Sequence, residues 1–353
     1  MATNPHRNRG DSIMSSIQYS VVIPTYNRAE SLLNTLESLS KVQLLEETEV
    51  IVVDNNSSDQ TKDVVEKAMA WFPERLHYVF EPEQGRSAAL NAGIRACRGE
   101  IILITDDDVQ LDADWICAAR RGLAEEKCDY VCGKVLPIWQ KERPRWLPNR
   151  GGKHWGVVGL LDYGTEAIKL GAQVPIGVNM AFRRDAFARA GMWNNLVGRR
   201  GTSLLGQEVR EWCLRARAVG LTGFYIPEMV VHHSISSDRL TKRYFRRWFY
   251  WHGISRAILF ELRGVDMETP EETTLDFSKV PQIMGVPRYM YRSCFHMFTR
   301  ILSSAVRRDQ VATFENELWL WFFAGVLAQR WKARDRGLKS GSKSTESDSK
   351  TRL

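Results

Sequence analysis

The stretch Glu100-Ile-Ile-Leu-Ile-Thr-Asp-Asp-Asp-Val109 decides the fold. Its first half, Ile101 to Ile104, has the length and the β-branched residues of a buried strand. Carboxylates cannot lie unpaired inside a core, because each buried charge costs several kcal/mol. Asp106, Asp107 and Asp108 must therefore follow the end of the strand and face a crevice. In open α/β sheets, ligands bind at this carboxyl edge.

The three adjacent aspartates predict a metal site. Like charges at this spacing repel one another, and a bound cation relieves that repulsion. Ligands that are all oxygens favour Mg²⁺ or Mn²⁺, held by one or two carboxylates together with substrate phosphates. The alternative interpretation is an acidic turn that caps the next helix, which would begin between Asp112 and Trp115.

Composition and charge narrow the class of protein. The chain has 353 residues, 44% of them hydrophobic, which suffices for one large domain or two modest ones. A net charge of +7 suits an acidic partner such as a nucleotide diphosphate or an anionic membrane surface. No nucleic-acid motif accompanies this charge, so we expect no nucleic-acid partner.

The expected location is the cytoplasm, with the cytoplasmic face of a membrane as the alternative. The six cysteines are scattered and are typical of reduced thiols. The first residues contain no apolar signal-peptide core. The longest apolar run, Leu318 to Ala328, is too short to span a bilayer.

Strands alternate with helices in the first third of the chain. A strand from Tyr19 that stops at Pro24 is followed by strands at 50–53, 76–80 and 101–104, with helices near 32–39, 60–71 and 87–96 between them. This order predicts an α/β fold with a mostly parallel sheet covered on both faces. Polar clusters follow each strand and should converge on one crevice. Neither G-x-G-x-x-G after the first strand nor G-x-x-x-x-G-K-[ST] occurs, which argues against an NAD enzyme and a P-loop NTPase.

Four motifs resemble those of the family 2 glycosyltransferases, in that family's order and spacing. They are Val21-Val-Ile-Pro-Thr-Tyr-Asn-Arg28, Val52-Val-Asp-Asn-Asn-Ser-Ser-Asp59, Gly85-Arg-Ser-Ala-Ala-Leu-Asn-Ala-Gly93 and Thr105-Asp-Asp-Asp108. Two later segments, Gly177-Val-Asn-Met-Ala-Phe-Arg-Arg184 and Gly206-Gln-Glu-Val-Arg-Glu211, also match, so the resemblance runs from about residue 19 to 233. It implies a GT-A fold, in which a Rossmann-like nucleotide half joins an acceptor half. It also implies a nucleotide-sugar donor and, usually, inversion at the anomeric carbon.

The same resemblance implies which residues form the site. Asp54 would contact the base or ribose, and Pro24 with Tyr26 would line the base pocket. His233 matches a histidine that lies near the metal or diphosphate in related proteins, although a lone histidine also suits a structural role. The expected nucleotide-binding residues are Pro24, Thr25, Tyr26, Arg28, Asp54, Asn56, Arg86, Asn91 and Asp106. The expected ligands of Mg²⁺ or Mn²⁺ are Asp106, Asp107, Asp108 and His233.

Two positions depart from the family's pattern. Leu90 stands where the family often has an arginine, and our hypothesis is that Arg86, one helical turn earlier, reaches the same crevice. Gln207 replaces the first acid of a Glu-Asp pair, whereas Glu208 keeps a carboxylate at the position of the general base. An inverting transfer needs such a base to take the proton of the acceptor hydroxyl, so Glu208 is the expected catalytic residue. A solvated carboxylate at a helix start is the alternative, and Glu211 is the backup base.

Two later segments, residues 131–174 and 239–263, each allow two structural interpretations. Residues 131–174 are rich in Trp, Pro and Gly without periodicity, which fits an acceptor loop or an ordinary surface loop. Segment 239–263 is predicted to be a helix with a basic side and an aromatic side. That composition is typical of a helix lying on a membrane surface, but equally of a helix that packs its aromatic residues on the catalytic domain. Two more helices are expected over 287–330.

These observations predict a GT-A domain over 18–238, a C-terminal helical region over 239–335, and disordered tails over 1–17 and 336–353. We expect an inverting glycosyltransferase of polysaccharide biosynthesis that transfers to a glycan, a lipid-linked sugar or a small molecule. It should be non-processive, because Tyr244-Phe-Arg-Arg-Trp248 lacks the glutamine of the Q-x-x-R-W motif of processive synthases. The alternatives are a donor-binding or membrane-scaffold protein that has lost catalysis, and a nucleotidyl transferase. The missing Gly-rich, Lys/Arg-bearing first loop argues against the latter.

Overall fold

The computed structural model describes residues 17–147, 154–171, 173–268 and 279–349, with residues 334–349 described by their backbone alone. The disordered tail predicted at the N-terminus lies outside these residues, except for its last position. At the other end, helix α9 (Gln310–Ser349) runs through most of the segment for which a disordered tail is predicted. Residues 350–353 lie outside the described part.

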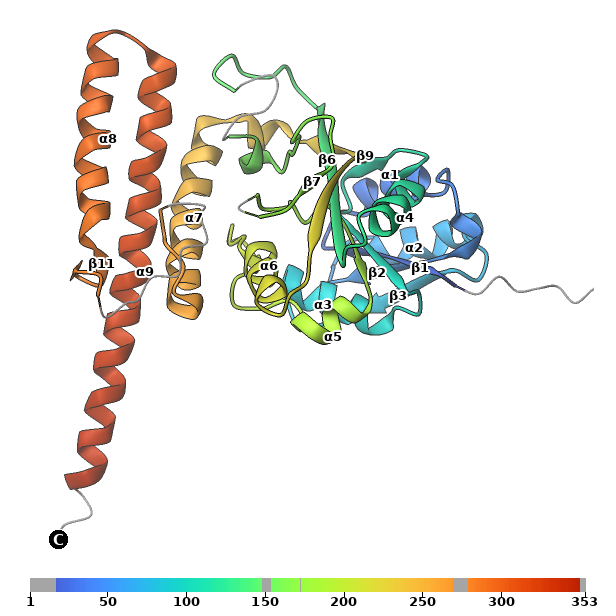
Figure 1. Ribbon diagram of the computed structural model, residues 1–353, viewed down its shortest axis with the longest axis horizontal. Helices are drawn as coiled ribbons and strands as arrows, with labels where there is room; N and C mark the ends of the chain where they lie inside the picture. Colours follow the sequence, from blue (N-terminus) through green and yellow to red (C-terminus); the bar gives the residue numbers. More distant parts are fainter. Residues whose placement is uncertain (1–16, 148–153, 172, 269–278, 350–353) are drawn as a thin grey trace, which may run out of the picture.

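The N-terminal half is built on the parallel strands that the sequence predicts. Strand β1 (Tyr19–Thr25) lies between β2 (Thr48–Asp54) and β4 (Ile101–Thr105), and β3 (Leu76–Phe80) flanks β2, all in parallel register. Their valine, isoleucine and leucine side chains are buried except for the partly buried Val79 and Ile101, as expected for strands covered on both faces. The connecting helices are α1 (Ala29–Leu39), α2 (Thr61–Ala68) and α3 (Arg86–Ala96), seen on the right of Figure 1.

Further strands extend the same sheet beyond β4, mostly in antiparallel pairs. The order is β3-β2-β1-β4-β8-β6-β9-β5, and β7 (Ile168–Lys169) pairs with β9 outside this path. Strand β8 (Asn179–Arg183) pairs antiparallel with both β4 and β6 (Tyr130–Trp139), which itself runs parallel to β9 (Gly223–Ile235). The expectation of an irregular segment from residue 131 is wrong for residues 131–139. Pairing with β9 along its whole length holds this strand despite Gly133 and Pro137, with a register shift between Gly133 and Lys134, and β8 pairs with its first three residues.

A short strand that we did not predict from the sequence directly follows the three aspartates and joins them to the antiparallel half of the sheet. Strand β5 (Val109–Leu111) pairs antiparallel with β9, and this register sets Val109 opposite His233. The backbone N–H of Ser234 donates to the carbonyl of Asp108 at 2.8 Å. The aspartates and His233, far apart in sequence, therefore meet at one edge. Helices α4 (Trp115–Glu125), α5 (Asp185–Ala190) and α6 (Glu208–Ala218) complete this part of the chain.

Three C-terminal helices stand beside the sheet, as the left of Figure 1 shows. They are α7 (Lys242–Arg263), α8 (Arg288–Val306) and α9, and the helices predicted over 239–263 and 287–330 are confirmed. Helices α7 and α9 cross in close contact. A Cβ atom at Gly253 would lie 2.0 Å from the carbonyl oxygen of Phe322, and one at Gly325 would lie 1.9 Å from that of Tyr250. A short hairpin of β10 (Gln282–Ile283) and β11 (Val286–Pro287) precedes α8.

The contacts of α7 favour the packing interpretation of segment 239–263. Phe245 is buried in the main core, and Trp248 packs against that core. On the basic side, Arg246 forms an ion pair with Glu317 of α9 at 2.6 Å, and Lys242 lies 4.9 Å from the ring centroid of Phe314. Both sides of α7 thus contact protein, and membrane contact through this helix finds no support in its contacts. Among the described residues, no helix is long and apolar enough to cross a membrane.

The close contact between α7 and α9 at Gly253 and Gly325 predicts an effect on stability. Substituting Gly253→Ala places a methyl group against backbone atoms, which cannot turn aside as a side chain does, so the two helices must separate. We expect a loss of about 1–3 kcal/mol in the free energy of unfolding, measured by chemical denaturation. The matched control is Gly171→Ala, where the nearest atom to a new Cβ is 3.9 Å away. Equal stability of both variants would contradict the close crossing.

Candidate active site

A cavity of about 370 Å³ opens at the carboxyl ends of β1 and β4. Its lining comes from both halves of the sheet and from the first C-terminal helix. The β1 loop contributes Pro24 to Tyr26, and the end of β4 contributes the three aspartates. The opposite walls include residues 156–159, residues 174–178, His233, Trp248 and His252. Strand ends that are remote in sequence thus surround one hollow, as the sequence predicts.

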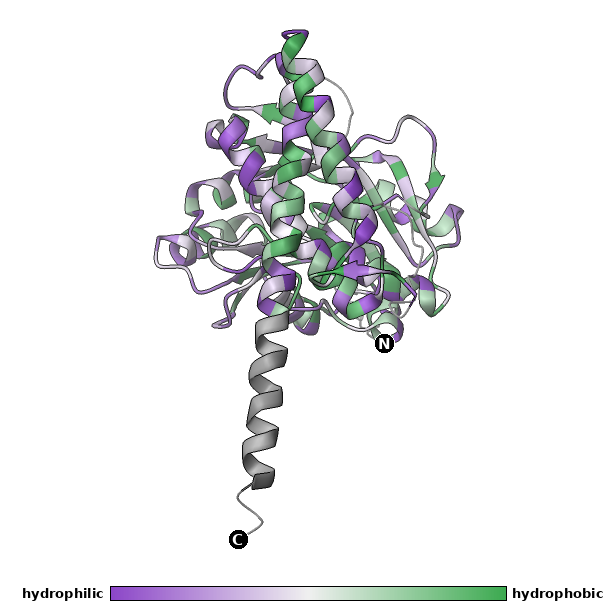
Figure 2. Cartoon of the chain, turned by 90° about the vertical axis from the view of Figure 1, so that its left-hand side faces the viewer, coloured by the Kyte–Doolittle hydropathy of each residue, from purple (hydrophilic) through white to green (hydrophobic). Residues whose placement is uncertain are grey.

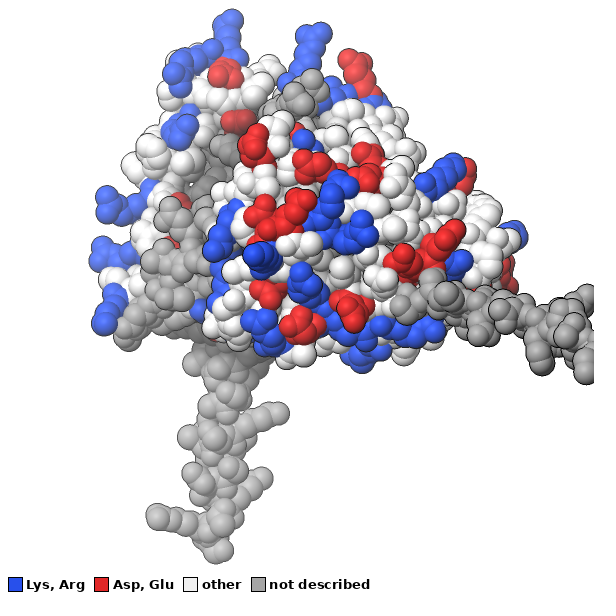
Figure 3. Space-filling view, turned by 45° about the vertical axis from the view of Figure 1, so that its right-hand side comes forward, with Lys and Arg blue, Asp and Glu red and all other residues white. Residues whose placement is uncertain are grey.

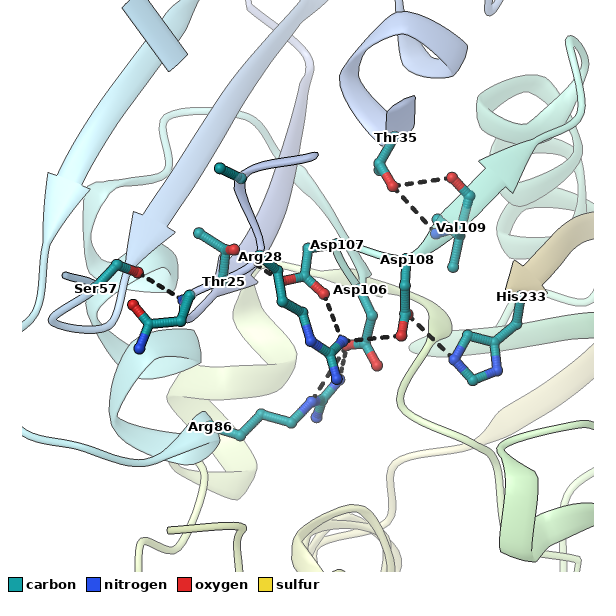
Figure 4. A network of polar contacts seen from close by, with 12 residues as sticks. Thr25, Arg28, Thr35, Ser57, Arg86, Asp106, Asp107, Asp108, Val109 and His233 are labelled. Carbon is teal, nitrogen blue, oxygen red and sulfur yellow. Dashed lines mark hydrogen bonds and ion pairs between the residues drawn. The ribbon is translucent and has the colours of Figure 1, made fainter. Parts of the chain in front are cut away.

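Both carboxylate oxygens of Asp107 are held by hydrogen bonds. One carboxylate oxygen accepts a hydrogen bond from Arg28 at 2.9 Å, and the other accepts from the hydroxyl of Thr25 at 2.7 Å. Burial raises the pKa of Asp107 to about 6, and Arg28 and Thr25 only partly oppose that rise. Figure 4 shows Arg28 reaching from the β1 loop to Asp107 and Asp108 together. Arg28 therefore bridges two neighbouring carboxylates.

Asp108 lies close to two arginines and a histidine from different parts of the chain. Its oxygens are 2.9 Å from Arg28, 3.1 Å from Nε2 of His233 and 3.6 Å from Arg239. Burial alone would raise the pKa of Asp108, but these groups, His233 foremost, outweigh it and lower the pKa far below its usual range. The hydroxyl of Thr35 on α1 bonds both backbone groups of Val109, which fixes the chain just after the cluster (Figure 4).

Asp106 is connected to Glu208 through Arg86. The guanidinium of Arg86 donates to Asp106 at 2.7 Å and to the carbonyl of Gly177 at 2.9 Å, and it lies 3.4 Å from Glu208. Arg86 is the first residue of α3, and the preceding Gly85 has a φ of +148°, a conformation that favours glycine. Our hypothesis that Arg86 reaches the crevice despite Leu90 therefore matches the geometry.

Glu208 combines burial with an unused oxygen. It is the first residue of α6, its side chain lines the cavity, and only 6% of the residue is exposed. Burial raises the pKa of this carboxyl, although the charge of Arg86 opposes the rise. One oxygen pairs with Arg86, whereas Oε2 has no hydrogen-bond partner among the described residues. A buried acceptor in this state is available to the proton of a bound hydroxyl.

Glu211, the backup base, does not reach the cavity. Its side chain is fully buried and forms ion pairs with Arg215 of α6 at 3.0 Å and with Arg263 at the end of α7 at 2.5 Å. These pairs use its oxygens to fasten α6 to α7. The sequence could not separate the two glutamates, because both lie in the first turn of the same helix.

The structure brings most of the predicted site residues to the cavity. The predicted residues that line it are Pro24, Thr25, Tyr26, Arg28, Arg86, Asp106, Asp107, Asp108, Glu208 and His233. Three others take different places. Asp54 accepts hydrogen bonds from Tyr78 at 2.7 Å and from the backbone of Ser57, and Asn56 is exposed. Asn91 exchanges two 2.9 Å hydrogen bonds with the backbone of Trp193, so it holds that loop.

The cavity also contains residues that the sequence did not single out. Asn55, directly before Asn56, lines the cavity, and its side-chain oxygen Oδ1 accepts a hydrogen bond from the backbone N–H of Gly85 at 2.7 Å. Trp248 and His252 of α7 form part of the far wall, and their rings stack with centroids 4.6 Å apart. Burial lowers the pKa of His252 to about 3, so its ring is neutral. The spacing of these two residues places them on one face of a helix, which is compatible with a cavity wall. The same spacing is also typical of an aromatic face that packs on the protein, so the sequence could not identify them.

The aspartate oxygens and the His233 nitrogens supply only part of the ligands that a metal ion needs. Among the described residues, no group of three His, Cys, Asp or Glu side chains converges on one point. The carboxylates instead pair with arginines. Asp106 nevertheless keeps Oδ2 outside these contacts, and Asp108 and His233 lie beside it on the cavity wall. This donor set suits Mg²⁺ or Mn²⁺ when a diphosphate supplies the remaining oxygens.

The sheet with its C-terminal helices is a GT-A fold, and the comparisons with known proteins identify a glycosyltransferase that uses a nucleotide sugar. Residues 20–191 match the sequence profile of Glycosyl transferase family 2, and this part of the chain is a family 2 glycosyltransferase domain. The sequence resemblance is therefore confirmed, as is the prediction of a glycosyltransferase.

Similar proteins agree with this assignment. A glucosyl-dolichyl phosphate glucuronosyltransferase of Haloferax volcanii is 26% identical over 249 residues, covering 69% of this chain and 77% of the relative. An uncharacterized glycosyltransferase of Bacillus subtilis, YfnE, is 36% identical over 114 residues, but the match covers only 32% of this chain and 29% of YfnE. The mannosyltransferase PcManGT from Pyrobaculum calidifontis, solved with GDP-Man and Mn²⁺, has a TM-score of 0.59 at 17% identity. That likeness covers 90% of this chain and 88% of the other, and it shows the shared fold.

The contacts of Arg86 predict its effect on donor binding. The substitution Arg86→Ala removes a cation that lies between two carboxylates, so an anionic diphosphate would meet uncompensated negative charge. We expect affinity for a nucleoside diphosphate, measured by titration calorimetry, to fall roughly tenfold or more. Arg95→Ala, on the exposed last turn of the same helix, is the matched control and should leave affinity unchanged. Unchanged affinity in Arg86→Ala would refute a role at the diphosphate.

Proposed function

We propose that this protein is an inverting, non-processive glycosyltransferase in which Glu208 is the general base. The observation that carries the proposal is the state of Glu208: it is buried at the cavity wall, with one oxygen held by Arg86 and the other unpaired. The donor chemistry belongs to residues 18–238. The helical region 239–335 adds the stacked Trp248 and His252 to the wall on the acceptor side.

The transfer proceeds as a single displacement. An acceptor hydroxyl donates to Oε2 of Glu208, and its oxygen attacks the anomeric carbon of the sugar as its proton passes to the carboxylate. The bond from that carbon to the nucleoside diphosphate breaks on the opposite side, which inverts the configuration. Arg86 holds Glu208 and Asp106 in place, so the base and the diphosphate site keep a fixed relation.

The leaving diphosphate needs positive charge at the end of β4. Mg²⁺ or Mn²⁺ held by Asp106 and Asp108 with His233 would neutralise the negative charge that develops there. Arg28 and Arg239 both lie beside Asp108 and are placed to exchange this carboxylate for phosphate oxygens. The nucleotide-binding set predicted from the sequence, including Asp54, Asn56 and Asn91, remains part of this proposal.

The acceptor is a sugar hydroxyl on a glycan or on a lipid-linked carrier. Aromatic rings such as Trp248 offer a flat apolar surface against which sugar rings stack. The relative from Haloferax volcanii is named for a dolichyl phosphate-linked glucose, which supports a lipid-linked acceptor within polysaccharide or glycan biosynthesis. We place the reaction in the cytoplasm, because all six cysteines are free thiols.

A donor panel tests the proposal. Purified protein is supplied with UDP-, GDP- and dTDP-sugars, with Mg²⁺ or Mn²⁺, and release of the nucleoside diphosphate is measured with and without glycan and lipid-linked acceptors. We expect metal-dependent turnover of one donor class. The Glu208→Gln variant should bind that donor as the wild type does and lose roughly 10²–10⁴-fold in turnover.

The control for Glu208→Gln is Glu228→Gln, which removes an exposed carboxylate of β9 and should leave turnover unchanged. Because burial raises the pKa of Glu208, the acid limb of the pH profile should lie above the usual value for glutamic acid. Donor binding without turnover for every donor and acceptor class would contradict the proposal and favour a binding or scaffold protein.

A further inference from the structure

The outer face of helix α8 exposes a row of large apolar side chains. Phe295 is 70% exposed, Phe298 51%, Leu302 53% and Val306 85%. At about 100° per residue these four side chains fall within an arc of about 80° on the helix. Figure 2 looks onto the C-terminal helices from this side. Exposed apolar surface that is contiguous rather than scattered marks an interaction site.

The neighbouring hairpin extends this surface. Ile283 and Met284, at the turn between β10 and β11, are 46% and 45% exposed. The hydroxyl of Tyr291 on α8 donates to the carbonyl of Ile283 at 2.9 Å, which ties the turn to the helix. The apolar row and the turn form one surface, which we call the α8 surface: Ile283, Met284, Phe295, Phe298, Leu302 and Val306.

Along the sequence, helix α8 and its immediate flanks carry charge of one sign. Residues 280–308 contain five arginines and neither aspartate nor glutamate. Arg288, Arg292 and Arg300 are exposed on α8, and Arg307 with Arg308 follows its end. The helical angles place Arg288 and Arg292 at the margin of the apolar row. In Figure 3, basic side chains project along the left-hand edge of the molecule.

We propose that the α8 surface binds the headgroup region of an anionic lipid bilayer. A helix with an apolar face and a cationic border lies in the plane of such a surface, with its apolar side chains below the headgroups. Anionic lipids attract each nearby arginine with about 1 kcal/mol. A second copy of the chain is a poorer partner, because a symmetric contact would bring the same arginines together without a compensating carboxylate.

This assignment differs from the membrane contact predicted for segment 239–263. The basic and aromatic sides of α7 contact α9 and the catalytic domain, whereas α8 lies outside α9 and contacts it by its other face. The inference does not depend on the transfer chemistry, because none of its residues lines the cavity.

Vesicle flotation of the full chain tests the inference. The probes are vesicles of phosphatidylcholine alone and of phosphatidylcholine mixed with phosphatidylglycerol. We expect the wild type to float with the mixed vesicles at low salt and to be released at high salt. The triple variant Phe295→Gln/Phe298→Gln/Leu302→Gln should lose at least tenfold in partitioning, and Arg292→Gln/Arg300→Gln roughly fivefold for each arginine.

Matched controls remove similar groups elsewhere on the surface. Met69→Gln/Trp71→Gln changes side chains that are 40% and 39% exposed, and Lys67→Gln/Arg95→Gln removes two exposed cations. Both should float as the wild type does, and all variants should keep its melting temperature. Equal flotation with neutral vesicles, no flotation at all, or full flotation of the triple variant would overturn the inference. So would light scattering that shows a wild-type dimer and a monomeric triple variant.

Discussion

The pairing of three adjacent carboxylates at the end of β4 determines how this molecule is assembled. Asp107 and Asp108 share Arg28 from the β1 loop, and Asp106 is paired with Arg86 from α3. His233 and Arg239 complete the shell around Asp108. Unpaired, these charges would repel one another in a buried place and destabilise the fold. The same pairing joins the parallel half of the sheet to β9, so the charges that would serve the substrate also hold the two halves together.

The parallel half could be predicted from the sequence because its signals are local. Each strand is a short β-branched run that ends in a polar motif, and the motif places the site residues at the strand's end. The antiparallel half could not be predicted, because β6 and β5 exist through pairing with β9, which lies about a hundred residues away. For the same reason the sequence does not favour Asn55 over Asn56 as a site residue, or exclude Glu211 as a base beside Glu208. Only tertiary packing determines which of two such neighbours faces the cavity.

Two of the C-terminal helices have similar compositions, although one is packed against the protein and the other exposes its apolar side chains. Helix α7 has arginines and aromatic rings on opposite sides, yet its basic side contacts Glu317 and Phe314 of α9. Glycines at the crossing bring the two backbones into contact. Helix α8 has a similar composition, but its apolar row is exposed among the described residues. Composition alone therefore could not separate a membrane helix from a packed one, and the packing of α9 decides which helix is covered.

The most direct test of this account is the affinity for Mn²⁺ with and without a nucleoside diphosphate, measured by electron paramagnetic resonance. Arginines and His233 contact the carboxylates in the structure, and we expect a diphosphate to draw the arginines away and to add its own oxygens to the metal site. We therefore expect weak Mn²⁺ binding to the protein alone and binding at least roughly tenfold tighter with the diphosphate, as coupled ligands require. Tight Mn²⁺ binding to the protein alone, unchanged by the diphosphate, would contradict this account.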